Sequence, residues 1–181
     1  MFLLAQGFWW SIDVVPFSFS YLDMDPNRQA GGERLEKTFG AGAAFCVGYH
    51  YQMKSGWFLD GVASLNGYAK YIDFIRVWTF SDPELVGGTL ELMRISIGKY
   101  VSDHWAVYGA LNPLTGFLII SKIYGVGIKA GLGVLHKNGF YAELNYTTPL
   151  WASVEKNYLY PVPFQIAFGV RLPFSKEAKS V

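Results

Sequence analysis

The sequence predicts an all-β fold, an eight-stranded antiparallel up-and-down transmembrane β-barrel. Three observations lead to this prediction: the composition, the alternation of side chains along the chain, and the alternation of short turns with long connections. Of the 181 residues, 16% are charged, 18% are aromatic and 20 are glycine. Soluble domains usually carry roughly 25% charged residues, whereas membrane barrels combine little charge with belts of aromatic residues.

The charge and the cysteine content exclude several classes of function. The net charge of +1 gives no argument for an acidic substrate or a nucleic-acid partner, so no nucleic acid is expected to bind. The single cysteine, Cys46, excludes an internal disulfide and a metal site built on a cysteine cluster. We therefore expect Cys46 to be a small packing residue, and we expect neither a cofactor nor a metal ion.

The strands can be placed in order from a period-two alternation of side chains. They are predicted near residues 9–21, 38–53, 57–71, 88–101, 105–112, 123–136, 140–148 and 164–174. In the first strand the apolar set changes parity at Pro16, which predicts a bulge because proline lacks an amide donor. The sixth strand lies in the most apolar window, where glycine at every second position disfavours a helix.

Three short turns support the register of these strands. If the turns at 54–56, 102–104 and 137–139 are three-residue loops, Met53 pairs with Trp57, Val101 with Trp105, and His136 with Phe140. The inside and outside faces then agree across all three hairpins, and two of the turns place glycine last, as such hairpins need. The alternate connections, near 24–37, 73–87, 113–122 and 149–163, are longer, which is typical of a bacterial outer-membrane barrel.

The last strand shows the alternation most clearly. One face carries six large apolar residues: Phe164, Ile166, Phe168, Val170, Leu172 and Phe174. The other face carries smaller residues and one cation: Gln165, Ala167, Gly169, Arg171 and Pro173. A soluble sandwich would turn a more polar face to water, so this strand is expected to separate lipid from a crowded lumen.

This last strand and the alternation of short and long connections resemble those of the small eight-stranded outer-membrane proteins, the broad group of OmpA-type domains, OmpX and OmpW. The resemblance implies the outer membrane of a Gram-negative bacterium, with the bilayer and lipopolysaccharide as surroundings and a monomeric state. It also implies that the six apolar residues ending at Phe174 are a signal for the barrel-assembly machinery. The chain departs from that pattern because seven residues, 175–181, follow the aromatic residue.

The resemblance also suggests a division of the chain into a barrel and two tails. Residues 1–8 are expected to be an N-terminal tail or a signal-peptide remnant, because the apolar start is shorter than the usual ~7–15 residues. Residues 9–174 would form the transmembrane barrel, and residues 175–181 a short periplasmic tail.

The interior of an eight-stranded barrel is just wide enough for side chains to fill it, so at most a narrow pore is expected. The predicted polar network of the lumen is Asp13, His50, Asp60, Arg94, Lys129, Glu143 and Arg171. Within it His50 faces Asp60, and Arg171 is expected to lie between Asp13 and Glu143. We interpret this network either as a plug of buried ion pairs that closes the lumen or as a gated, narrow ion path that opens when the ion pairs exchange partners.

Aromatic residues mark the ends of the strands. The girdle at the short-turn end is predicted to consist of Trp9, Trp10, Trp57, Trp105, Phe140 and Phe174. Trp78 and Trp151, in or beside long connections, are expected to be either interface anchors or contacts to a ligand.

Two further functions compete with that of a non-enzymatic membrane barrel. A lipid A-modifying hydrolase needs a serine, a base and an acid close together, for which Ser11, His50 and Asp60 are the candidates, although they would face the lumen. A soluble lipocalin-like ligand-binding barrel would need an apolar interior and a polar exterior. A metal site from His50 and Asp60 alone has too few ligands.

Overall fold

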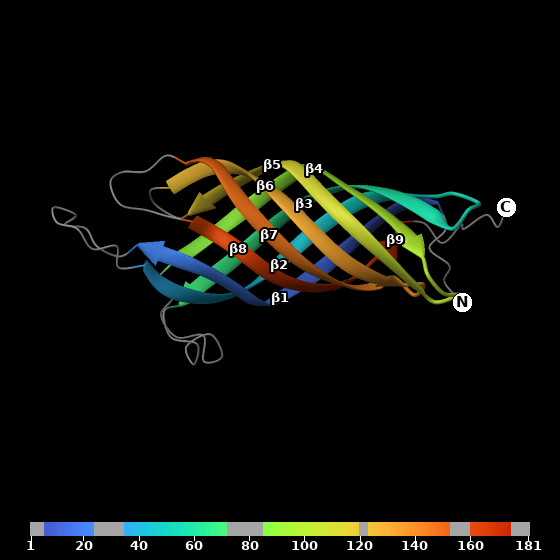
Figure 1. The fold of residues 1–181 in the computed structure, drawn as a ribbon, viewed down its shortest axis with the longest axis horizontal. Coiled ribbons are helices and arrows are strands. Elements are labelled where there is room, and N and C mark those ends of the chain that lie inside the picture. The colour runs from blue at the N-terminus through green and yellow to red at the C-terminus, as the bar shows by residue number, and fades with distance from the viewer. Residues whose placement is uncertain (1–5, 24–34, 72–84, 120–122, 153–159, 175–181) are drawn as a thin grey trace.

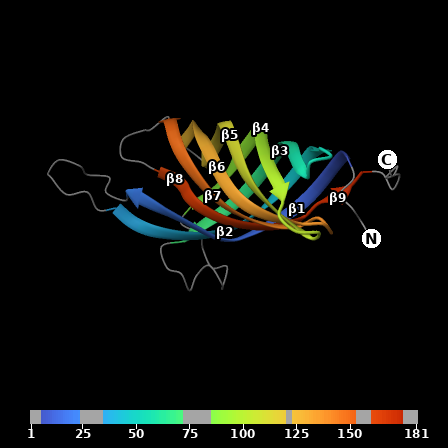
Figure 2. The same cartoon turned by 45° about the vertical axis from the view of Figure 1, so that its right-hand side comes forward.

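A computed structural model of the chain describes residues 6–23, 35–71, 85–119, 123–152 and 160–174. These residues form one closed barrel whose strands run obliquely around it (Figure 1), and Figure 2 shows the same arrangement from a second direction. The strands are β1 (Gly7–Asp23), β2 (Leu35–Gln52), β3 (Trp57–Tyr71), β4 (Leu85–Tyr100), β5 (Trp105–Ile119), β6 (Ile123–His136), β7 (Phe140–Ala152), β8 (Tyr160–Val170) and β9 (Leu172–Pro173). Within these residues, no helix is long and apolar enough to cross a membrane.

The strands follow one another around the barrel in the order of the sequence. Each pairs antiparallel with the next, and β1 pairs with both β2 and β8, which closes the sheet. The short β9 continues β8 beyond Arg171 and pairs with the same strand, β1. The predicted fold class, an all-β, eight-stranded antiparallel up-and-down barrel, is therefore confirmed.

The three tight turns are the predicted three-residue loops. The backbone N–H of Met53 donates to the carbonyl of Trp57 at 2.8 Å, and that of Val101 donates to Trp105 at 2.9 Å. In the third turn, the N–H of Gly139 donates to the carbonyl of His136 at 2.8 Å. Gly56 and Gly139 have positive φ angles of 78° and 88°, which is the left-handed conformation that glycine adopts without strain.

Several strands are longer than the sequence indicated. β2 and β4 begin at Leu35 and Leu85, β5 continues to Ile119, and β7 reaches Ala152. The long connections are correspondingly shorter than expected, and residues 24–34, 72–84, 120–122 and 153–159 lie outside the described residues. The predictions for residues 1–5, for the tail at 175–181 and for Trp78 fall on residues outside this description.

The bulge at Pro16 is confirmed, because the pairing of β1 with β2 shifts between Val15 and Ser18. Further irregularities were not anticipated. In β4, Leu92 and Met93 lie between the cross-strand pairs Val62–Arg94 and Ser64–Glu91. In β5, Pro113 and Leu114 lie between the pairs Asn112–Lys129 and Thr115–Gly127. Each of these two bulges moves two consecutive apolar residues to the outside.

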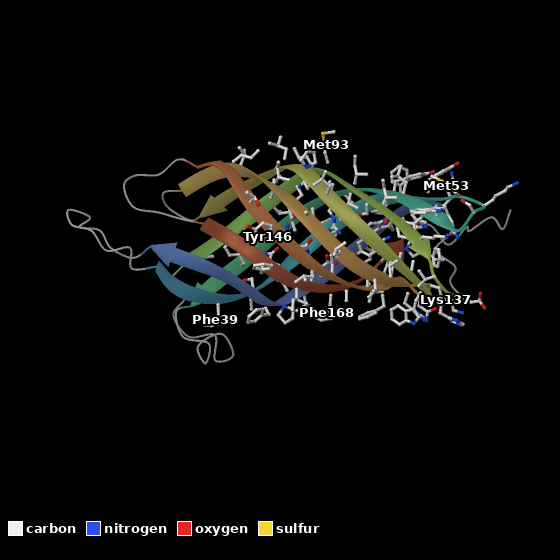
Figure 3. All side chains as sticks on the ribbon, in the orientation of Figure 1. Phe39, Met53, Met93, Lys137, Tyr146 and Phe168 are labelled. Carbon is white, nitrogen blue, oxygen red and sulfur yellow. The ribbon has the colours of Figure 1, made fainter. Side chains whose placement is uncertain are left out.

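The outer face of the barrel is apolar on every strand, as Figure 3 illustrates with the outward side chains of Met93 and Phe168. Between residues 164 and 174, the six apolar residues from Phe164 to Phe174 are all exposed, whereas Gln165, Ala167 and Arg171 are buried. The inside carries polar, charged, small and ring-bearing residues instead. This polarity is the reverse of the one that a soluble lipocalin-like barrel requires.

Glycines on the inner face make room for aromatic rings from the next strand. Four such rings each lie directly opposite a glycine in the antiparallel register: Trp9 opposite Gly48, Phe58 opposite Gly98, Tyr108 opposite Gly133, and Tyr141 opposite Gly169. A β-carbon added to any of these glycines would overlap the facing ring. The alternating glycines therefore allow the lumen to be filled by aromatic side chains.

The prediction that Trp9 belongs to the outer girdle is wrong. Trp9 is only 2% exposed and packs inside, against Gly48. The physical reason is the alternation itself, because Trp9 shares its face with Ser11 and Asp13, which both point into the lumen.

We expect Gly48→Ala to destabilise the barrel by about 1–3 kcal/mol, the usual cost of overpacking a well-filled interior. The added methyl group would lie 2.9 Å from the backbone carbonyl oxygen of Gly61 and would press on the Trp9 ring. Gly61→Ala is the matched control, because a β-carbon at this exposed position meets no atom within 4 Å. Equilibrium urea unfolding measures both effects, and equal stability of the two variants would contradict the packing described here.

Candidate functional site

The candidate site is the polar lumen, into which all seven residues of the predicted network project. Their exposed fractions are small: Asp13 3%, His50 0%, Asp60 0%, Arg94 7%, Lys129 6%, Glu143 2% and Arg171 2%. Burial of unpaired charges would cost several kcal/mol per ion, so the arrangement of partners decides what this lumen can do.

Asp60 contacts the side chains of His50 and Arg171 near the short-turn end. Its Oδ1 atom lies 2.6 Å from Nδ1 of His50, its direct cross-strand partner, as the sequence predicted. Its Oδ2 atom accepts a hydrogen bond of 2.8 Å from Nη1 of Arg171. The Arg171 guanidinium carbon also lies 4.5 Å from the centre of the Trp9 ring, which gives this cation an aromatic partner.

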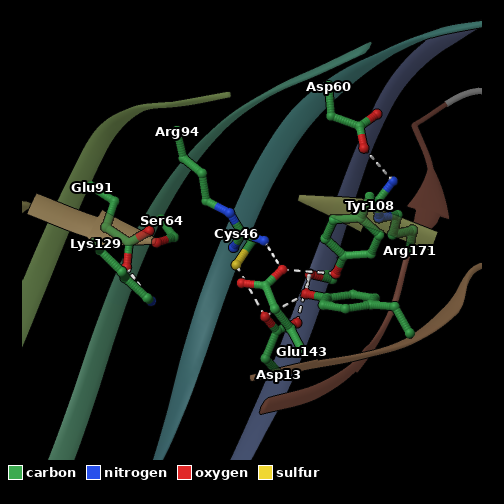
Figure 4. A network of polar contacts seen from close by, with 12 residues as sticks. Asp13, Cys46, Asp60, Ser64, Glu91, Arg94, Tyr108, Lys129, Glu143 and Arg171 are labelled. Carbon is green, nitrogen blue, oxygen red and sulfur yellow. Dashed lines mark hydrogen bonds and ion pairs between the residues drawn. The ribbon is translucent and has the colours of Figure 1, made fainter. Parts of the chain in front are cut away.

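The expectation that Arg171 bridges Asp13 and Glu143 is wrong. Figure 4 shows Arg171 directed to Asp60, which comes from the far side of the lumen, on β3. The long arginine side chain spans the narrow interior, while the Tyr141 ring lies beside it, 5.3 Å from the guanidinium carbon. The ion-pair partner of Arg171 is therefore not a residue of the two strands next to it.

Glu143 and Asp13 have other partners. Glu143 forms a buried ion pair with Arg94, and its Oε2 atom accepts a hydrogen bond of 2.7 Å from the hydroxyl of Tyr108. Asp13 accepts hydrogen bonds from the hydroxyls of Ser11 and Tyr141 and from the thiol of Cys46.

The charge balance of the lumen explains the donors around Asp13. Among the described buried residues, four carboxylates face three permanent cations: Asp13, Asp60, Glu91 and Glu143 against Arg94, Lys129 and Arg171. The three permanent cations pair with Asp60, Glu91 and Glu143, and three neutral donors converge on Asp13 instead. Cys46 is thus a buried polar contact rather than a packing residue alone.

Sequence reasoning missed one charged residue, Glu91. Its Oε1 atom lies 2.6 Å from Nζ of Lys129 and accepts a weaker hydrogen bond of 3.4 Å from Asn66. Strict alternation from Arg94 would place Glu91 outside, but the bulge at Leu92 and Met93 turns it inward. The adjacent pair of large apolar residues was the signal in the sequence that could have indicated this bulge.

Asn112 supports the facing bulge in β5. Its Oδ1 atom accepts a hydrogen bond of 3.2 Å from the backbone N–H of Leu114, and its Nδ2 atom donates to Oγ1 of Thr115 at 2.9 Å. The side chain thereby satisfies a backbone donor inside the bulge, where Pro113 has no N–H to offer.

The candidates for a hydrolase do not form a catalytic triad. Ser11 bonds Asp13 and Tyr141, and its cross-strand partner is Cys46, whereas that of His50 is Gly7. Cys46 and His50 are four positions apart on β2, about 13 Å along an extended strand. Within the described residues, Nε2 of His50 has no hydrogen-bond partner, and no three His, Cys, Asp or Glu side chains group as a metal site.

The predicted girdle, other than Trp9, lies on the outer face at the short-turn end. Trp57 is 44% exposed, Trp105 42%, Phe140 40% and Phe174 61%, while Trp10 is half-buried. The backbone of Trp151 belongs to β7, and its side chain is outside the description.

No protein-family model and no curated protein matches this chain. Among the solved structures, the chain is similar to the beta domain of the Bordetella autotransporter BrkA, with 14% sequence identity and a TM-score of 0.43. The match covers 93% of this chain and 68% of that one. At this level of likeness, function has to be argued from the residues of the chain itself.

The partner of Arg171 can be tested with double-mutant cycles. Arg171→Met combined with Asp60→Asn should give a coupling energy of about 0.5–3 kcal/mol, because the two groups share a buried hydrogen bond. Arg171→Met combined with Glu143→Gln should couple by less than about 0.5 kcal/mol. Urea unfolding of the single and double variants measures both values. Stronger coupling to Glu143 than to Asp60 would contradict the observed pairing.

Proposed function

We propose that this chain is an integral β-barrel protein of the outer membrane of a Gram-negative bacterium, with a lumen closed by side chains. The observation that carries the proposal is the apolar outer face, which continues across every strand of the closed sheet. Monomeric soluble proteins rarely expose contiguous apolar patches beyond a few hundred Å², whereas a bilayer solvates such a surface.

The strand lengths support the same proposal. A tilted transmembrane strand needs roughly 9–11 residues, and β1 to β8 have between 11 and 18. In a closed barrel every strand has a hydrogen-bonded neighbour on both sides, so the wall can lie in hydrocarbon without unpaired backbone groups at a sheet edge. The short turns would then lie on the periplasmic side, and the long connections would face the cell exterior.

The inside of the barrel supports a structural or surface role rather than transport of large solutes. Ion pairs across the lumen, such as Arg171 with Asp60 and Arg94 with Glu143, and the ring of Tyr108 between them occupy its short-turn half. Under this proposal any activity toward other molecules resides in the long connections, and at most a narrow pore crosses the barrel. The chain functions as a monomer surrounded by phospholipid and lipopolysaccharide.

The last strand is proposed to be the signal that the barrel-assembly machinery reads. Its apolar residues all point outward, where another protein can contact them before the barrel is inserted into the bilayer. The strand pairs with β1 at the seam that closes the barrel, so its recognition precedes closure in this proposal.

Refolding into detergent micelles tests the membrane proposal directly. We expect the unheated protein to migrate faster in gel electrophoresis than the boiled protein, because a closed barrel stays compact in the detergent. In planar bilayers we expect either no conductance or small, narrow-pore events. A protein that is monomeric in buffer without detergent would contradict the membrane proposal, and large, steady porin-like conductance would contradict the closed lumen.

A further inference from the structure

Among the described residues, the exposed charges of the short-turn end lie on β4, at the end of β6 and on the tight turns. We call the following residues the basic sector: Lys54, Lys99, His104, His136 and Lys137, which belong to β4, β6 and the three tight turns. Within the described residues, the acidic side chain among these turns is Asp103. The start of β7 and the region around β9 and β1 present the apolar rings of Phe140, Phe174 and Phe8 at the same end.

Lys99 stands on the outer wall over an exposed tryptophan. It faces Trp57 across β3 and β4, and its Nζ atom lies 5.6 Å from the centre of the Trp57 ring. No ion pair with a carboxylate is recorded for Lys99 within the described residues. The ring therefore orients this ammonium group while its N–H donors stay available to a ligand.

A second group of side chains lies on the neighbouring strands. Trp105 faces His136 across β5 and β6, with ring centres 4.7 Å apart, and His104 stacks on His136 at 6.1 Å. The backbone N–H of Lys137 donates to the carbonyl of His104 at 2.8 Å, which holds the two turns side by side. The imidazoles and the Lys137 ammonium thus belong to one connected surface.

Lys99 lies at the border of the apolar band on the outer wall of β4. The outward residues that precede it on β4 are Met93, Ile95 and Ile97, all exposed and apolar. Lys99 is the next outward position, so a cation follows directly after the apolar band. In a bilayer this is the depth of the lipid phosphates, where lysine ammonium groups and tryptophan rings are favoured.

We propose that the basic sector binds the phosphate groups of anionic glycerophospholipids in the leaflet at the short-turn end. This inference rests on the proposed membrane location. Three lysines against one aspartate make the sector positive, and each lysine near an anionic surface contributes a favourable electrostatic attraction. The apolar rings of Phe8, Phe140 and Phe174 contact acyl chains without selecting a headgroup.

Electron spin resonance of spin-labelled lipids can test this selectivity. The refolded full chain is reconstituted in phosphatidylcholine vesicles that contain a trace of spin-labelled phosphatidylglycerol or spin-labelled phosphatidylcholine. We expect phosphatidylglycerol to associate with the barrel about two- to fivefold more strongly, in keeping with the attraction of a few surface lysines. The preference should decrease in high salt, because mobile ions screen exposed charges.

The double variant Lys99→Gln with Lys137→Gln should lose most of this preference, and Lys99→Arg with Lys137→Arg, the matched control, should keep it. Both variants should still show the heat-dependent change in gel mobility. Equal association of the two lipids with the unmodified chain, or a preference that survives in the glutamine variant, would overturn the proposal. Failure of the chain to enter vesicles of either lipid would instead refute the membrane location.

Discussion

An eight-stranded barrel is so narrow that side chains from opposite walls meet, and every inward position must be filled without overlap. This constraint explains the glycines of the chain. Trp9, Phe58, Tyr108 and Tyr141 each occupy space above a glycine on the adjacent strand. Since one ring then fills the volume of two inward positions, the small inner face seen in the sequence reflects tight packing rather than an open pore.

The same narrow space forces charges into direct contact across the lumen. Asp60 is bonded by His50 and Arg171, and Glu143 by Arg94 and Tyr108. The bulge in β4 turns both Glu91 and Arg94 inward although they are three residues apart, an odd spacing that regular alternation forbids. Irregularities of the wall therefore occur where the interior needs additional polar partners.

The outer face has no such requirement for pairing and is apolar up to the rim. Charge returns on the outside at Lys99 and on the tight turns, next to Trp57 and Trp105. The polar lumen and the apolar wall thus follow from one period-two alternation of side chains. The outward positions of this alternation change from apolar to charged and aromatic at the short-turn end. This is why the location in a membrane and the closure of the lumen are linked in the proposed function.

The eight strands, the three-residue turns, the bulge at Pro16 and the pairing of His50 with Asp60 can all be predicted from the sequence, since each depends on positions within one strand or hairpin. The alternation also indicates the inward position of Trp9, since Trp9 shares its parity with Ser11 and Asp13. The bond between Arg171 and Asp60 and the inward position of Glu91 depend instead on the closed barrel and its bulges. Alternation assigns a face to a side chain, but it specifies neither how far a long side chain reaches across a closed barrel nor where a bulge reverses the face.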